Sequence, residues 1–174
     1  MMVLEKAVLR AMRQDDKPGL CALLARNVAS GASIGFLAPL AQEVAARYWH
    51  QVYADMLEGR RLALVACDGQ GGLLGAAQLE FCFKENGGHR AEVQKLMVAP
   101  EARRQGIASR LMRQLEEEAR LERVELLVLD TAKGSEAERL YQGLGWTRAG
   151  EIPDFALDAV TRQPHATAMY WKRL

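Results

Sequence analysis

The sequence predicts one α/β domain, a mixed sheet with helices on its faces, and three observations support this prediction. The chain has 174 residues, enough for one domain with its own core. Apolar residues make up 49% and charged residues 26% of the chain, as in ordinary globular domains. Strand-like runs and segments of helical period alternate in the order β-α-α-β-β-β-α-β-α-β-β. This is not the order of a doubly wound dinucleotide-binding fold.

Helix start and stop signals define the first elements. Asp15, Asp16 and Pro18 are typical of a helix start, with acidic caps and a proline in the first turn. Leucines follow at helical spacing until Gly31, a residue type that commonly ends helices. The elements predicted for this part are a strand over 3–12, a helix that ends at Gly31, a loop over 33–39 and a helix over 40–57.

The rest of the chain is rich in strands, which are recognised as β-rich apolar runs between turns. The DGQGG stretch at 68–72 joins two such runs, so it predicts a hairpin turn rather than a phosphate-binding loop. The run at 124–130 is almost continuously apolar, as expected for a strand covered on both faces. The predicted strands are 61–68, 73–83, 91–98, 124–130, 146–152 and 165–174, and the predicted helices are 106–121 and 135–144.

Composition argues against several classes of function. A formal charge of +1 gives no general attraction to nucleic acid or to an anionic membrane. No stretch approaches the roughly 18 apolar residues of a membrane span, and the start of the chain lacks a signal-peptide pattern. The three cysteines lie far apart in apolar surroundings, which indicates reduced core thiols, and the three histidines have no metal-ligand spacing. We therefore expect a cytoplasmic protein without a metal, nucleic-acid or membrane partner.

The stretch RRQGIASRLM, beginning at Arg103, has the features of a phosphate-binding helix start. The first turn of a helix has free backbone N–H groups and the positive end of the helix dipole, which favour an anion. Gly106 and the small Ala108 permit close approach, while Arg103 and Arg104 add charge that can pair with phosphate oxygens. The alternative is a capped helix with solvated arginines. The motif favours a pyrophosphate site at the end of a strand.

Two longer stretches resemble a known family. VQKLMVAPEARRQGIASRLM resembles the acyl-coenzyme-A binding motif of GNAT-type N-acetyltransferases, and LVLDTAKGSEAERLYQGLGWTRAGE resembles the next strand and helix of that family. SIGFLAPL, GGHRAEVQKLMV, VLDTAKGSEAERLY and HATAMYWKRL look like segments of the bacterial tabtoxin-resistance acetyltransferases, which acetylate the free amine of a β-lactam amino acid toxin. Ala108 stands where many members have glycine, and Gly134 where many have asparagine.

The resemblance implies a GNAT-type fold, a mixed and mostly antiparallel sheet flanked by helices, with acetyl-CoA as the cofactor. In that family the strand equivalent to 91–98 splays from its neighbour, and its free N–H groups bind the pantetheine amides and polarise the thioester carbonyl. The alternative is that these are ordinary residues of a strand ladder. The implied cofactor-binding residues are Leu96, Met97, Val98, Arg103, Arg104, Gln105, Gly106, Ile107, Ala108, Ser109, Thr131, Ala137 and Tyr141.

Acetyl transfer to an amine needs a base, because an aliphatic amine with a pKa of roughly 10 is protonated at neutral pH. Glu92 starts one predicted strand and Asp130 ends another, and the resemblance points to these two positions as base and ammonium-binding pair. The alternatives are a solvated charge for Glu92 and a turn residue for Asp130. The resemblance also implies that Tyr141 faces the coenzyme sulfur as general acid, against the alternative that it only packs on the sheet.

The acceptor is predicted to be a small amine that resembles an amino acid, such as a toxin or antibiotic. Residues suggested for the acceptor wall are Ile34, Phe36, Trp49, Gln78 and Phe81. The alternatives are an acyl-coenzyme-A sensor without turnover, or an acetyltransferase of protein N-termini or lysines that needs a groove open at both ends. The sequence leaves the oligomeric state open, a homodimer included.

Overall fold

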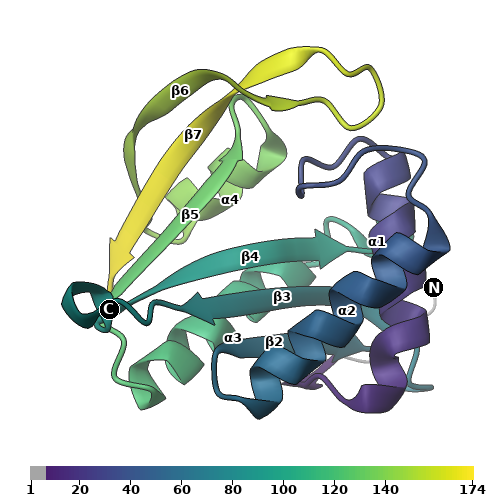
Figure 1. The fold of residues 1–174 in the computed structure, drawn as a ribbon, viewed down its shortest axis with the longest axis horizontal. Coiled ribbons are helices and arrows are strands. Elements are labelled where there is room, and N and C mark those ends of the chain that lie inside the picture. Colours follow the sequence, from purple (N-terminus) through teal and green to yellow (C-terminus); the bar gives the residue numbers. More distant parts are fainter. Residues whose placement is uncertain (1–6) are drawn as a thin grey trace.

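The structure is a computed structural model, and it describes residues 7–174. One seven-stranded sheet has the strand order β1-β2-β3-β4-β5-β7-β6 (Figure 1). Helix α2 crosses in front of β2 and β3, and α3 lies behind them in the same view. The elements are β1 Val8–Ala11, α1 Lys17–Ala29, α2 Gln42–Leu57, β2 Arg61–Cys67, β3 Leu73–Phe81, β4 Arg90–Val98, α3 Ile107–Leu121, β5 Leu126–Ala132, α4 Glu136–Gly143, β6 Thr147–Leu157 and β7 Pro164–Arg173.

The predicted fold class and element order are confirmed over the described residues. The expected first strand falls partly on residues 1–6, which lie outside the description. β5 continues to Ala132, so Asp130 lies within the strand rather than at its end. β6 continues to Leu157, beyond the predicted end at 152 and through Pro153. A sheet edge tolerates proline, and a register shift between Ile152 and Ala156 absorbs it.

Helix α3 is fixed to the sheet by a close approach at Gly75. A Cβ atom at Gly75 would lie 2.8 Å from the carbonyl oxygen of Met97 and 3.2 Å from the side chains of Ile107 and Leu111. Only a glycine leaves room for this packing. Leu111, Met112 and Leu115 are completely buried on the face of α3 that meets the sheet. The first turn of α3 is thereby held against β3 and the end of β4.

The sheet divides between β4 and β5. These two strands pair in parallel only over Arg90–Glu92 with Leu126–Val128, and they diverge beyond Glu92 and Val128 (Figure 1). We call the point of divergence the fork. β4 also carries a bulge, because the β3–β4 register shifts between Ala76 and Gln78, and Lys95 there has φ 52°. The seam between the two parts of the sheet is therefore only three residue pairs long.

A buried ion pair joins the two parts of the sheet away from the fork. Both carboxylate oxygens of Glu116 on α3 accept from the Lys172 ammonium on β7, at 2.7 and 2.8 Å. The indole N–H of Trp146 also donates to Glu116, at 3.2 Å, and Lys172 donates to the carbonyl of Leu144 at 2.7 Å. Glu116 is 5% exposed, so this cluster links α3 to β7 in the interior. Within residues 7–174, no helix has the length and apolar character needed to cross a bilayer.

Candidate active site

The start of α3 presents its backbone N–H groups without a side-chain cap. Gly106 precedes the helix with φ 78°, a left-handed conformation that favours glycine, and within residues 7–174 no side chain caps the first turn. A Cβ atom at Gly106 would meet nothing within 4 Å. Ile107 is buried, whereas Ala108 and Ser109 are partly exposed. The arrangement leaves the positive end of α3 open to an anion.

The arginines before α3 have different surroundings. Arg103 turns toward α1 and donates to the side chains of Asn27, at 3.1 Å, and Ser30, at 3.0 Å. Arg104 is 83% exposed and lies 3.4 Å from Glu136 at the start of α4. An ion pair this exposed is weak, so Arg104 can exchange Glu136 for a phosphate. Gln105 donates to the carbonyl of Glu101 at 3.3 Å.

The direction of the backbone N–H groups of β4 beyond the fork follows from its pairing with β3. Ala99 donates its N–H to Leu74 of β3 at 2.8 Å. Because successive N–H groups of a strand point to opposite sides, the N–H of Met97 also faces β3, while those of Leu96 and Val98 face the diverging β5. The expected role of the Met97 N–H as a free donor is therefore wrong, and Leu96 and Val98 keep this role as candidates.

Glu92 and Asp130 lie at the fork on one face of the sheet. Glu92 pairs with Val128 in the β4–β5 register, and Asp130 follows two residues later on β5, so both side chains share a face. Burial raises the pKa of Glu92, and the negative charge of Asp130 raises it further. A carboxyl group with a raised pKa is suited to accept a proton near neutral pH.

Tyr141 is buried beside the same carboxylate. Its ring lies 6.0 Å from the rings of Trp146 and Tyr170, and the residue is 6% exposed. Burial raises the pKa of Tyr141, and Asp130 adds to this effect, so the hydroxyl keeps its proton at neutral pH. The strand of Asp130 also brings Thr131 close to α4, where its hydroxyl lies 3.3 Å from that of Ser135. Ala137 is half-buried in the first turn of α4.

The residues expected to form the acceptor wall lie in three different places. Ile34 and Phe36 are partly buried on the loop between α1 and α2. Trp49 and Gln78 are completely buried, so the structure places them in the core and not on an open wall. Side chains of β3 alternate in direction, and Gly75 already faces α3, so Phe81 lies on the α3 face and cannot share a wall with Phe36.

Lys95 is a residue of this region that the sequence analysis missed. The bulge turns its side chain to the face of Gln94, where its ammonium lies 5.6 Å from the ring centroids of both Phe36 and Tyr48. Burial lowers the pKa of Lys95, as does the charge of Arg61, while Asp130 and Glu92 act in the opposite direction. In a regular strand, side chains alternate, and Lys95 would lie on the face of the sheet opposite to Gln94. The sequence pattern therefore does not indicate that Lys95 reaches this region.

Direct contacts connect the α1–α2 loop to the hairpin of β6 and β7. Ala38 donates its N–H to the carbonyl of Ala159 at 2.8 Å, and Arg162 donates to the carbonyl of Ala38 at 2.7 Å. Ser33 and His165 lie 3.3 Å apart through their side chains. We call these contacts the roof. They join elements from the two parts of the sheet, on the side that carries Phe36 and Lys95.

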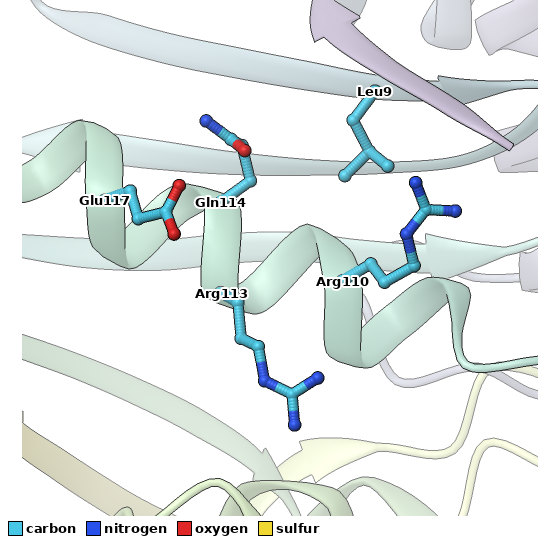
Figure 2. Close-up of a pocket in the computed structure, with 5 residues that line it drawn as sticks. All are labelled: Leu9, Arg110, Arg113, Gln114 and Glu117. Carbon is cyan, nitrogen blue, oxygen red and sulfur yellow. The ribbon is translucent and has the colours of Figure 1, made fainter.

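A separate depression lies on the outer side of α3 (Figure 2). Figure 2 shows Arg110 and Gln114 near Leu9 of β1, whereas Arg113 points away from them. Arg110 donates to the carbonyl of Ala7 at 2.6 Å, which ties β1 to α3. None of the candidate site residues lines this depression, whose lining is Leu9, Arg110, Arg113, Gln114 and Glu117.

Comparison with known proteins decides the family. The model of the Acetyltransferase (GNAT) family matches residues 33–146. The chain belongs to this family. A relative named as an uncharacterized N-acetyltransferase in the hisH-hisA intergenic region of Azospirillum brasilense is 35% identical over 121 residues, which is 68% of this chain and 70% of the relative. The GNAT chain is thus an N-acetyltransferase whose acetyl donor is acetyl-CoA.

Solved structures of two enzymes share the GNAT fold of this chain equally well. A phosphinothricin acetyltransferase from Sinorhizobium meliloti, in complex with acetyl-CoA, has a TM-score of 0.81 at 18% identity and covers 98% of this chain and 89% of its own. A ribosomal-protein-alanine N-acetyltransferase from Brucella melitensis also has a TM-score of 0.81, at 23% identity, and covers 96% of this chain and 99% of its own. Because their names give different acceptors, the fold does not choose the acceptor of this GNAT enzyme.

Proposed function

We propose that this enzyme acetylates the primary amine of a small molecule that resembles an amino acid. The observation that carries the proposal is the position of Asp130, whose charge acts on both Glu92 and Tyr141 at the fork. A base and an acid beside one carboxylate are what amine acetylation requires. Their presence also argues against the alternative of an acyl-coenzyme-A sensor without turnover.

We further propose the residues that hold the donor. The open first turn of α3, with Arg104 beside it, would bind the pyrophosphate of acetyl-CoA. The N–H groups of Leu96 and Val98 would bind the pantetheine arm by strand-like pairing. Bound acetyl-CoA supplies the acetyl thioester that the reaction consumes. Gly134 has no side chain with which to bind the pantetheine arm, and the hydroxyls of Thr131 and Ser135, which lie 3.3 Å apart, are candidates for that contact.

The proposed chemistry assigns a proton movement to Glu92 and another to Tyr141, and an electrostatic role to Asp130. Asp130 attracts the ammonium group of the acceptor, and Glu92 removes a proton from it to free the nitrogen lone pair. With acetyl-CoA bound, the hydroxyl of Tyr141 would protonate the thiolate released when the C–S bond breaks. The acetylated nitrogen would lose its second proton to solvent, from which Tyr141 would recover its own. A raised pKa suits both roles, because Glu92 must hold a proton readily and Tyr141 must stay protonated until transfer.

The roof supports a small acceptor rather than a protein. A lysine or an N-terminus on a protein needs a groove through which the polypeptide can pass. The Ala38 N–H donates to the carbonyl of Ala159, and Arg162 donates to the carbonyl of Ala38. These two hydrogen bonds close the side of the site on which such a groove would open. A toxin or antibiotic that is itself a modified amino acid is a member of the proposed acceptor class, in line with the resemblance to tabtoxin-resistance enzymes.

The test is a thiol-release assay with acetyl-CoA and a panel of acceptors. The panel contains amino acids, β-lactam amino acids, simple alkylamines, aminoglycosides and peptides with free N-termini, and mass spectrometry identifies each product. We expect acetylation of one or more amino-acid-like acceptors with kcat/KM at least tenfold above that of any peptide. Preferred acetylation of peptides would overturn the proposal in favour of a protein acetyltransferase, and the absence of any turnover would favour the sensor.

A further inference from the structure

Lys95 has a charged ammonium group without an ionic or hydrogen-bonding partner among residues 7–174. No carboxylate of the described residues lies within 4.0 Å of it, and its contacts are the ring faces of Phe36 and Tyr48, each 5.6 Å from the ammonium. A Cβ atom placed on Gly35 would lie 3.2 Å from this nitrogen, so the loop between α1 and α2 closes directly over it. An ammonium has three hydrogen-bond donors, and these remain available to a ligand.

The neighbouring cation, Arg61, is already engaged. It pairs with Glu80 at 3.1 Å and donates to the side-chain oxygens of Gln78, at 2.9 Å, and Gln94, at 3.0 Å. Its side chain is 11% exposed, so it cannot turn toward a ligand without losing these bonds. Of these two neighbouring cations, Lys95 is the one that can meet an anion brought in from solvent.

Lys95 is also close to the carboxylates of the fork. The charges of Asp130 and Glu92 both act on its ammonium, although neither carboxylate reaches it directly. One side of the site is therefore negative at Glu92 and Asp130, and the other is positive at Lys95. A molecule that carries an ammonium and a carboxylate a few bonds apart matches this arrangement of charges.

We propose that Lys95 binds the carboxylate of the acceptor while Glu92 and Asp130 bind its ammonium, so that the acceptor is a zwitterionic amino acid. This inference rests on the proposed function, since it concerns the acceptor of the same reaction. The aromatic faces of Phe36 and Tyr48 fix the ammonium of Lys95 in position, which reduces the entropy lost when the carboxylate binds. Removal of the carboxylate from the acceptor leaves Lys95 without its anion.

The experiment compares Lys95→Met with wild type on two matched acceptors, an amino acid that the wild type acetylates and the amine obtained by its decarboxylation. We expect the wild type to have a KM at least tenfold lower for the amino acid than for the decarboxylated amine. Lys95→Met should raise the KM of the amino acid at least tenfold and leave that of the amine within about twofold, because methionine cannot donate the charge-assisted hydrogen bond to the carboxylate. Lys95→Arg keeps the charge and should retain the preference.

Lys17→Met is the matched control, because Lys17 also lies over an aromatic ring, that of Tyr53 at 5.4 Å, but at the start of α1. It should leave both KM values unchanged. At position 95, methionine has a similar length to lysine, and it adds no backbone strain because Lys95 itself already has φ 52°. An equal loss on both acceptors, or no loss on either, would overturn the role of Lys95 while the proposed amine acetylation stands. Failure of the wild type to acetylate any small amine would overturn the proposed function itself.

Discussion

At the scale of single residues, the pKa of Glu92 gives the reaction a defined pH dependence. Burial and then the charge of Asp130 raise this pKa, and in the proposed mechanism Glu92 can accept a proton only when it is deprotonated. The value of kcat/KM should therefore rise with pH through the pKa of Glu92. Asp130→Asn removes the negative charge and lowers this pKa, so the rise should move to lower pH while the maximal rate falls.

The measurement is the pH profile of kcat/KM for wild type, Asp130→Asn and Glu92→Gln. Glu92→Gln should lower kcat/KM by about 10²-fold or more and remove this rise from the profile, because the amide cannot accept the proton. If the profile of Glu92→Gln has the same shape as that of the wild type, another group is the base.

Tyr141 allows a test in which only one oxygen atom is removed. Tyr141→Phe keeps the ring that packs against Trp146 and Tyr170 and deletes the hydroxyl. Turnover should fall by roughly 10²-fold, the usual contribution of a positioned acid, while the Kd of acetyl-CoA stays within about twofold. Steady-state kinetics and calorimetric titration separate the two quantities. Unchanged turnover would reduce Tyr141 to a packing residue of α4.

At the scale of elements, the start of α3 predicts a specific effect on donor binding. Gly106→Ala places a methyl group where the structure has open space, and it also introduces strain at φ 78°. Gly71→Ala in the turn between β2 and β3 introduces the same kind of strain at φ 86°, also into open space. Both variants should lose about 1 kcal/mol of stability, but only Gly106→Ala should raise the Kd of acetyl-CoA, by tenfold or more.

Calorimetric titration with acetyl-CoA and thermal unfolding distinguish the two effects of Gly106→Ala. Equal Kd values for Gly106→Ala and Gly71→Ala would show that the first turn of α3 does not contact the donor.

Helix α3 also carries the ion pair that holds the two parts of the sheet together. Glu116→Ala leaves the ammonium of Lys172 without its carboxylate in a largely buried position and removes the acceptor of the Trp146 indole N–H. The expected loss is about 3 kcal/mol of unfolding free energy, or about 10 °C in Tm for a chain of this size. Glu117→Ala changes the next residue, which is exposed, and should stay within about 0.5 kcal/mol of wild type. Chemical denaturation compares the two, and similar losses would contradict a stabilising role of the buried pair.

At the scale of the whole molecule, the fold could be predicted because its signals are local. The helix start at Pro18 and the turn at 68–72 depend on neighbouring residues only, and both agree with the structure. The carboxylate of Asp16 does not cap α1 as predicted, because it accepts hydrogen bonds from Arg10 and from the backbone N–H of Arg13. The exceptions are β5 and β6, which both run beyond their predicted ends, and in β6 Pro153 suggests the end of a strand. The strand tolerates Pro153 because β6 lies at the edge of the sheet. The neighbouring residues contain no information about the strand order that places it there.

The candidate site could be predicted only where its residues belong to a motif or lie on strands that the family resemblance places side by side. Glu92 and Asp130 meet because two strands are neighbours, and the resemblance to a family gives that pairing. Lys95 depends on a bulge, and Trp49 depends on the packing of α2. A shift of one residue in a strand reverses the direction of its side chains, so a bulge that the sequence does not indicate changes which side chains reach the site.

The short seam between β4 and β5 has a consequence for handling the purified enzyme. Beyond the three paired residues each strand has an unpaired edge that lies inside the molecule, including the N–H groups of Leu96 and Val98. Unpaired strand edges recruit other strands, and this is a common origin of aggregation. A coenzyme that pairs with this edge shields it and, by binding only the folded state, also shifts the unfolding equilibrium. If the coenzyme binds at this edge as proposed, we expect coenzyme A in the storage buffer to lower the rate of aggregation.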